Sequence, residues 1–406
     1  MKLSRFGRIS MAFVALLAMG LGMTACGGGT VGYMWVLGTQ YNQISGFKID
    51  DYTGNLTTMV GSPYSSGGTN PIAIVVRPGG HYVYVVNKGI PATSTSPAVG
   101  GNIAEFSVGG DGVLTFQASY TSQGSTPVWA VMDTTGSYLY VLDQVSPDNV
   151  HGDITVFSIA SDTGRLSLVP NQQLKNSNGT QLNYFPVGIK PTTMRLTGAS
   201  CLFTLDSADN TLFPYSVSSG GQLNLVANST ITTQAVKATS LSASGSYLYI
   251  TDAGATPNAS QILPYSVGSS CSLNSVTGGA VANLPLTANP VYSFTDSKNK
   301  FFYVLNQSST NSLNPSSSIS FFNILSNGQL QANGDPNNPY PVGSGPVCMA
   351  EDPTNQYMYI SSSVSNTVTG KLLNQNTGQL SDLTRGSSFP SAEMPSCMAI
   401  SGSTSP

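Results

Sequence analysis

A short strand-like phrase occurs seven times along the chain, at intervals of 46 to 63 residues. Its clearest copies are Tyr138-Leu139-Tyr140-Val141-Leu142-Asp143 and Tyr82-Val83-Tyr84-Val85-Val86-Asn87. Runs of aromatic and β-branched residues predict β-strands. Repetition at this period is typical of propellers, solenoids and other repeat arrays. The second aromatic position of the phrase is held in turn by Trp35, Tyr84, Tyr140, Phe203, Tyr249, Tyr303 and Tyr359.

Each phrase lies within a longer unit that predicts four strands. A proline with a short apolar run precedes most copies, as in Pro127-Val128-Trp129-Ala130-Val131. A third run follows, as at residues 154–159, and a hairpin such as Gly164-Arg165-Leu166 leads into a fourth. A four-stranded antiparallel meander of this kind is one propeller blade.

The two ends of the repeat region predict a closed ring. The first unit starts at Tyr33 without a proline run, whereas Pro395-Ser396-Cys397-Met398-Ala399-Ile400 is a proline run without a following aromatic strand. Placing this segment beside residues 33–37 completes the first blade and leaves no free sheet edge. We therefore predict an all-β, seven-bladed β-propeller of twenty-eight strands over residues 33–401, with a tail at 402–406. A right-handed parallel β-helix is the alternative, but it would not need complementary ends.

The N-terminus predicts export and a lipid anchor. Lys2, Arg5 and Arg8 precede an apolar stretch over residues 9–23, a signal-peptide layout that is short for a membrane span. The following Thr24-Ala25-Cys26 resembles the bacterial lipobox, in which the cysteine is diacylated, although Met23 stands where leucine is usual. Residues 1–25 are the expected lipoprotein signal peptide, and residues 26–32 the lipidated Cys26 with a glycine-rich tether. An ordinary signal peptide with an incidental cysteine is the alternative.

The composition limits the partners. Only 8% of the residues are charged and the net charge is −3, against about 25% charged in typical domains. Nucleic acid is excluded as a partner because the chain has no cluster of Lys and Arg to bind phosphates. We expect a monomer without a cofactor at the bacterial cell envelope, on its periplasmic or extracellular face. Its expected partners are the membrane, through the lipid, and a glycan or an envelope protein.

Four cysteines follow Cys26, and an oxidising compartment permits disulfides among them. Cys348 and Cys397 occupy the same position in the inner strands of blades seven and one, which are neighbours in a closed ring. Cys201 begins the second strand of blade four, and Cys271 lies in the last hairpin of blade five on the same side of the disc. The predicted pairs are Cys201–Cys271 and Cys348–Cys397, with buried free thiols as the alternative.

The insertions fall on one face of the predicted disc. The long, neutral loops all lie between second and third strands or between blades, whereas the other turns are short and rich in glycine. Long loops are often functional, so this looped face is the predicted binding face. Three carboxylates and a histidine there could take a cation, although solvated loop charges are commoner and no metal site is predicted. The candidate ligand-binding residues are Asp143, Asp148, His151, Asp153, Tyr184 and Tyr340.

The Tyr-x-Tyr-Val strands and the hairpins Thr53-Gly54-Asn55-Leu56, Thr163-Gly164-Arg165-Leu166 and Thr377-Gly378-Gln379-Leu380 resemble the seven-bladed lactonase family. That family includes 6-phosphogluconolactonase-type enzymes and adjoins the YVTN-repeat surface proteins. The resemblance implies His, Arg and Glu around the channel mouth, often in a Gly-Pro-Arg-His stretch that opens an inner strand. Here such openings read Thr126-Pro127-Val128-Trp129 and Lys190-Pro191-Thr192-Thr193, so no catalytic residue is assigned.

Two functions follow from these observations. The first is a lipid-anchored, non-catalytic binding or scaffold protein for a neutral ligand, glycan or protein partner, which the lack of a recognisable catalytic set favours. The alternative is a 6-phosphogluconolactonase-like hydrolase of a sugar lactone with a divergent site around Arg195, Asp206 and Lys237. Ionisable side chains that converge in the channel would favour the enzyme, whereas a neutral channel mouth would favour binding.

Overall fold

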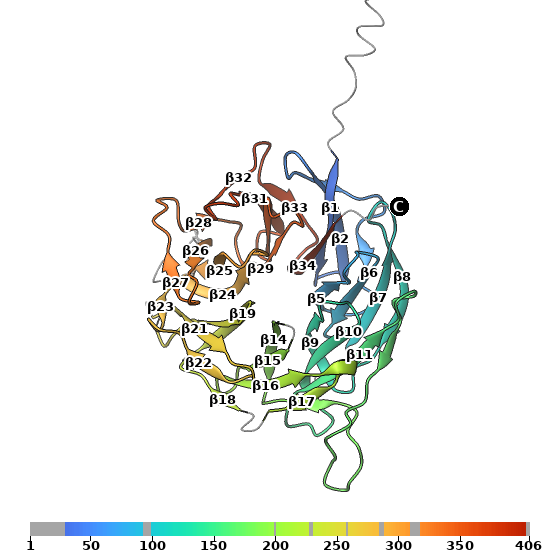
Figure 1. The fold of residues 1–406 in the computed structure, drawn as a ribbon. Coiled ribbons are helices and arrows are strands. Elements are labelled where there is room, and N and C mark those ends of the chain that lie inside the picture. Colours follow the sequence, from blue (N-terminus) through green and yellow to red (C-terminus); the bar gives the residue numbers. More distant parts are fainter. Residues whose placement is uncertain are drawn as a thin grey trace, which may run out of the picture.

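The computed structural model describes residues 29–91, 99–198, 200–226, 230–256, 259–283, 288–308 and 317–402. They form seven antiparallel sheets arranged as a ring, with the inner strand of each sheet towards the centre (Figure 1). The predicted seven-bladed β-propeller is confirmed. The predicted signal peptide, the lipidated Cys26 and residues 403–406 lie outside the described residues. Over the described ranges, no helix is long and apolar enough to cross a membrane.

The inner and second strands of each blade carry the proline runs and the aromatic phrases. The inner strands of blades one to seven are β34 (Pro395–Gly402), β5 (Pro71–Val76), β9 (Ser125–Met132), β14 (Pro191–Thr197), β19 (Ala238–Ser244), β24 (Ala288–Thr295) and β29 (Pro346–Glu351). The second strands are β1 (Thr30–Gly38), β6 (Tyr82–Asn87), β10 (Tyr138–Val145), β15 (Cys201–Asp206), β20 (Tyr247–Asp252), β25 (Phe301–Ser308) and β30 (Tyr357–Ser362).

The third strands complete the regular part of each blade. They are β2 (Gln43–Asp50), β7 (Asn102–Val108), β11 (Asp153–Ile159), β16 (Thr211–Val217), β21 (Gln261–Val267), β26 (Ser318–Ile324) and β31 (Thr367–Leu373). Sequence patterns located these strands well because their alternating side chains are buried on both faces between neighbouring blades.

The outer strands differ from the prediction of one strand per blade. Only blade two has a continuous outer strand, β8 (Leu114–Tyr120), and the other six split theirs into two short pieces that pair with the same third strand. A turn between the pieces interrupts the ladder, as where the Ser62 hydroxyl accepts a hydrogen bond from the Gly46 amide. The pieces are β3 (Leu56–Thr58) and β4 (Tyr64–Ser65), β12 (Leu166–Leu168) and β13 (Phe185–Pro186), β17 (Leu223–Leu225) and β18 (Ile231–Thr232), β22 (Leu273–Ser275) and β23 (Val281–Ala282), β27 (Leu330–Ala332) and β28 (Tyr340–Pro341), and β32 (Leu380–Asp382) and β33 (Ser388–Pro390).

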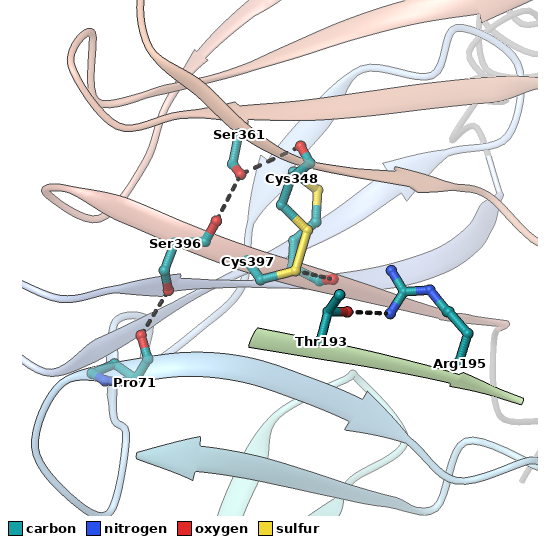
Figure 2. The surroundings of a disulfide bond; sticks show 8 residues. Pro71, Thr193, Arg195, Cys348, Ser361, Ser396 and Cys397 are labelled. Atoms are coloured by element: carbon teal, nitrogen blue, oxygen red, sulfur yellow. Dashed lines mark hydrogen bonds between the residues drawn. A yellow bond between two sulfur atoms is a disulfide. The ribbon is translucent and has the colours of Figure 1, made fainter. Parts of the chain in front are cut away.

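The ring closes as predicted. Strand β34 pairs antiparallel with β1, with Ile400 opposite Met34 and Ala399 opposite Trp35. The structure also has a disulfide between Cys397 on β34 and Cys348 on β29 of blade seven, with the two Cα atoms 5.1 Å apart (Figure 2). The two termini of the propeller therefore lie in one blade, which is covalently joined to the blade before it.

Neighbouring blades meet at a repeated joint that explains the aromatic phrase. At most joints the second aromatic donates a hydrogen bond to the glycine carbonyl of the next blade's outer hairpin, as Tyr84 does to Gly164 and Tyr359 to Gly54. The Tyr140 hydroxyl has no partner among the described residues, and Phe203 has no hydroxyl. The hairpin glycine has a positive φ, and the first aromatic packs directly on it. A Cβ added to Gly164, for example, would lie only 2.4 Å from Tyr82 Cδ1. The phrase is therefore a device that holds consecutive blades together.

One joint uses different chemistry. Between blades four and five, Cys201 stands where the other blades have the first aromatic, and Cys271 stands where they have the hairpin glycine. The structure links these two cysteines in a disulfide with the Cα atoms 5.6 Å apart, and Cys271 keeps the positive φ of the glycine position, at 58°. A covalent bond thus replaces the aromatic–glycine contact.

Candidate functional site

Equivalent positions of the inner strands build the channel wall. Each residue that pairs across the sheet with the second aromatic of the phrase belongs to one ring, which we call the middle ring. Its members come from all seven blades, so they lie about 50 residues apart in the chain but next to one another around the channel. The middle ring consists of Ala399, Val75, Val131, Arg195, Ser242, Phe294 and Ala350.

Arg195 is the one ionisable residue of the middle ring. Its guanidinium carbon lies 4.7 Å from the centre of the Trp129 ring, and its Nη1 donates a hydrogen bond to Met194 O at 2.9 Å. Nη1 also donates a hydrogen bond to Thr193 Oγ1 at 3.1 Å (Figure 2). Burial lowers the pKa of the guanidinium from its usual value, and nearby Tyr292 opposes this change. Arginine remains charged in proteins. In the described part of the chain, Arg195 has no carboxylate within ion-pair distance.

Arg195 lines a cavity of about 1130 Å³, which we call the channel cavity. The rim of this cavity is made of turns between first and second strands, such as residues 133–135, and of the turn between third and fourth strands at residues 218–220. It therefore opens on the face with short turns, opposite the looped face. Trp129 and Tyr292 line both this cavity and the smaller cavity at the looped face, so they lie where the channel narrows.

A second cavity of about 730 Å³ adjoins the first on the same face. The two share lining residues of blade six, including Tyr292 and Thr295. Glu351 from the end of β29 lines the second cavity and accepts hydrogen bonds from Ser297 N (2.7 Å), Ser297 Oγ (3.2 Å) and Asn355 Nδ2. Burial raises its pKa to about 7, and the nearby Asp296 and Asp352 act in the same direction.

The looped face is neutral at the channel mouth. A cavity of about 250 Å³ there is lined by uncharged residues of blades one, two, three, six and seven, among them Thr39, Ile72 and Ser396. The two larger cavities open on the opposite face, although a further cavity of about 440 Å³, lined by Gly254 and Ser260 among others, lies at the looped face. That the looped face carries the binding site stays a prediction. Loop length is visible in a sequence, whereas the space left between inner strands depends on side chains from every blade.

Two of the sequence-predicted ligand residues are buried under the looped face. Asp143 and Asp153 pair across β10 and β11, and both side chains are fully buried. Ser122 Oγ donates a hydrogen bond to Asp143 Oδ1 at 2.7 Å. Burial raises the pKa of both carboxyl groups, and the charge of Asp143 raises that of Asp153 further. A Cβ on Gly124 would lie 2.1 Å from Asp153 Oδ1. The connection between β8 and β9, residues 121–124, therefore covers the Asp143–Asp153 pair.

The other two members of that cluster, Asp148 and His151, contact each other, and the charge of Asp148 also raises the pKa of Asp153. Asp148 Oδ2 contacts His151 Nδ1 at 2.9 Å, and Oδ1 accepts hydrogen bonds from the backbone of Val150 and His151. These contacts organise the loop and lower the pKa of Asp148. Within the described residues no group of three or more His, Cys, Asp or Glu could hold a metal ion.

Of the two predicted tyrosines, Tyr184 lies near Asp148 and Asp153, whereas Tyr340 and the enzyme set lie elsewhere. Tyr340 is buried and donates a hydrogen bond to Asp335 Oδ2 at 2.7 Å, while Tyr184 is half-buried beside the Asp148 loop. Asp206 is buried and pairs across the sheet with Pro191. Pro191 lies four residues along β14 from Arg195, which corresponds to about 13 Å at the usual rise of a strand. The start of β19 is preceded by the exposed Lys237. The structure therefore does not bring Arg195, Asp206 and Lys237 together.

Comparisons with known proteins agree with this architecture. A family model described as "Lactonase, 7-bladed beta-propeller" matches residues 29–183. The resemblance to the seven-bladed lactonase propellers is confirmed. A putative 6-phosphogluconolactonase from Bacteroides fragilis superimposes with a TM-score of 0.67 at 16% identity, covering 92% of this chain and 99% of that chain.

Two further solved structures resemble this chain to the same degree. The periplasmic gluconolactonase PpgL of Pseudomonas aeruginosa has a TM-score of 0.68 at 15% identity, covering 92% of this chain and 100% of that chain. A protein from Lactobacillus plantarum has a TM-score of 0.68 at 18% identity with the same coverages. At these identities the likeness shows the fold alone, and no curated protein matches the chain. The comparisons give no support to the expected non-catalytic scaffold.

Proposed function

We propose that the protein is a lactonase-type hydrolase that opens a lactone ring in its central channel. The observation that carries this proposal is that Arg195 lines the channel cavity and its guanidinium has no carboxylate partner in the described chain. Burying a charge is costly unless something compensates it. A ligand oxygen that carries negative charge would provide that compensation.

The chemistry of lactone hydrolysis matches what a guanidinium supplies. Water adds to the acyl carbon, the ring C–O bond breaks, and the product is a hydroxy acid. Negative charge develops on the acyl oxygen during this addition and remains on the product carboxylate. The N–H groups of Arg195 would stabilise both states, because charge-assisted hydrogen bonds are strong in a site of low dielectric.

A base is needed to take a proton from the attacking water. Glu351 fits this role in the adjoining cavity, because a catalytic base works best when its pKa lies near the working pH. The shared wall of the two cavities at Tyr292 and Thr295 supports a substrate that reaches from Arg195 towards Glu351. The envelope location and the lipid anchor at Cys26 remain predictions from the sequence.

The test is a hydrolysis assay with a panel of γ- and δ-lactones, comparing wild type with Arg195→Gln. We expect the variant to lose about 10²- to 10³-fold in kcat/KM, as when one oxyanion donor is removed. Arg385→Gln is the matched control, because Arg385 is exposed and lies outside both cavities. Equal rates in wild type and Arg195→Gln, or no turnover of any lactone by the wild type, would refute the proposal.

A further inference from the structure

The channel cavity has a mainly hydrocarbon wall. The middle ring contributes Val75, Val131 and Phe294, and the next position along the inner strands contributes Met132 and Leu196. Trp129 and Tyr292 close the narrow end with aromatic surface. Arg195 is the only cation among the residues that line this cavity, all of which the structure describes.

Most polar side chains of the wall are already engaged inside the protein, whereas the buried hydroxyls of Tyr140 and Thr295 have no hydrogen-bond partner among the described residues. Ser242 Oγ donates a hydrogen bond to Ser293 O at 3.4 Å, and Ser293 Oγ is 3.1 Å from Ser240 Oγ. The Asp133 carboxylate accepts hydrogen bonds from the amides of Ser137 and Tyr138 in its own turn, at 2.8 and 2.6 Å. Few groups in the deep part of the cavity thus remain to replace water around a polyhydroxylated ring.

A phosphorylated substrate also fits this cavity poorly. A phosphoryl group carries close to two negative charges at neutral pH, and its recognition usually relies on a cluster of basic side chains or a nest of backbone amides. The wall offers one guanidinium, which the proposed reaction needs at the acyl oxygen.

We infer that the substrate is a lactone with a hydrocarbon substituent, alkyl or aryl, rather than a sugar lactone or its phosphate. The ring oxygen atoms lie toward Arg195, and the substituent lies against Trp129, Tyr292 and the aliphatic side chains of the inner strands. Binding sites for small molecules commonly combine such an apolar wall with a few placed polar groups. This inference rests on the proposed lactonase function and adds the substrate class.

The experiment compares δ-valerolactone, δ-octalactone, δ-decalactone, δ-gluconolactone and 6-phosphogluconolactone as substrates of the full mature chain. We expect kcat/KM to rise by up to about fourfold for each methylene added to the side chain, the factor for burying one methylene. Gluconolactone and its phosphate should be poorer substrates than δ-decalactone by at least tenfold. A higher kcat/KM for either sugar lactone overturns the inference and leaves the proposed function intact.

Binding is measured separately through tryptophan fluorescence with 5-hydroxydecanoate, the ring-opened form of δ-decalactone. The chain has two tryptophans: Trp129 lines the channel cavity, whereas Trp35 is fully buried and donates to Gly112 O at 3.0 Å. A change that saturates in wild type, is lost in Trp129→Phe and weakens at least tenfold in Arg195→Gln supports the hydrocarbon ligand class. Trp35 emission in the Phe variant shows that it is folded.

The two measurements separate the two ideas. Binding of the hydroxy acid without turnover of any lactone overturns the proposed hydrolysis and supports the ligand class. Neither binding nor turnover overturns both. Turnover of the alkyl lactones that is unaffected by Arg195→Gln overturns the assigned site.

Discussion

The buried and half-buried charges of this protein are satisfied in different ways. Lys371 is buried and pairs with Asp382 at 2.8 Å. Asp143 and Asp153 lie side by side, and burial raises the pKa of each, which favours protonation. Arg195 has neither an ion pair in the described chain nor the option of losing its proton. This difference is the reason why we propose a functional role for Arg195.

Glu351 gives a prediction of pH dependence for the proposed hydrolysis. A general base acts when it is deprotonated, and burial raises the pKa of Glu351 to about 7. We expect kcat/KM to rise with pH through about 7 and then level off. Glu351→Gln should lower the rate about 10²- to 10⁴-fold, the usual contribution of a general base, and remove the rise. Initial rates between pH 5 and 9 measure both effects.

Asp133→Asn is the matched control for Glu351. Asp133 also stands at the end of an inner strand and lines a cavity, but its carboxylate is bonded to its own turn. Its substitution should leave the pH profile unchanged. If Glu351→Gln keeps the wild-type rate and the increase in kcat/KM near pH 7, then Glu351 only holds the turn at residues 296–300 through its hydrogen bonds to Ser297. Another group would then be the base.

Single residues of the site were only partly predictable from the sequence. Arg195 was a candidate because it is a charge on a predicted inner strand. Trp129, Tyr292 and Glu351 were missed, because in the sequence they occupy ordinary repeat positions. Their neighbours in the channel come from blades many tens of residues away, and one sequence contains no direct signal for such contacts. The usable signal in the sequence was that Trp129, Tyr292 and Glu351 differ from the residues at the equivalent positions of most other blades, which are smaller or uncharged.

At the scale of the structural element, the blade joint explains why the repeats could be recognised. The hairpin glycine must adopt a positive φ and must leave room for the aromatic ring of the preceding blade. The aromatic phrase must supply that ring and, at most joints, a hydrogen-bond donor. Both requirements are local in sequence, so seven blades and the ring closure could be predicted. The interruption of the outer strands could not, because it depends on turns with weak sequence signals.

The joint gives a prediction about stability. Gly164→Ala should destabilise the fold by about 2–4 kcal/mol, because it adds backbone strain at φ 71° and a clash with Tyr82. Gly179→Ala is the control, since Gly179 has a similar φ of 78° but no atom within 4 Å of the added Cβ. It should cost about 1–2 kcal/mol. Denaturant unfolding of both variants measures the difference, and equal losses would show that the ring contact adds nothing.

For the whole molecule, stability depends on how the ring is closed. One disulfide replaces a joint between blades four and five, and the other lies at the seam, where β34 meets blade seven. Near the second disulfide, Ser396 Oγ donates to Pro71 O at 2.7 Å, and Ser361 Oγ donates to Ser396 O at 3.3 Å (Figure 2). Strand β34 is thereby attached to blades two and seven in addition to its ladder with β1.

The two disulfides make a test of ring closure. They enclose segments of 70 and 49 residues, so loop entropy alone predicts nearly equal stabilisation, roughly 4 kcal/mol each. Replacing Cys348 and Cys397 together by serine should nevertheless destabilise the protein more than replacing Cys201 and Cys271, because β34 can then separate from the ring and expose the edge of β1. Replacing Cys201 and Cys271 together leaves both ends of the chain paired. We expect hydrogen exchange in Cys348→Ser/Cys397→Ser to speed up selectively in β1 and β34, with a lower Tm than in the other double variant. Uniform exchange and equal Tm values would mean that the ladder between β1 and β34 closes the ring without covalent help.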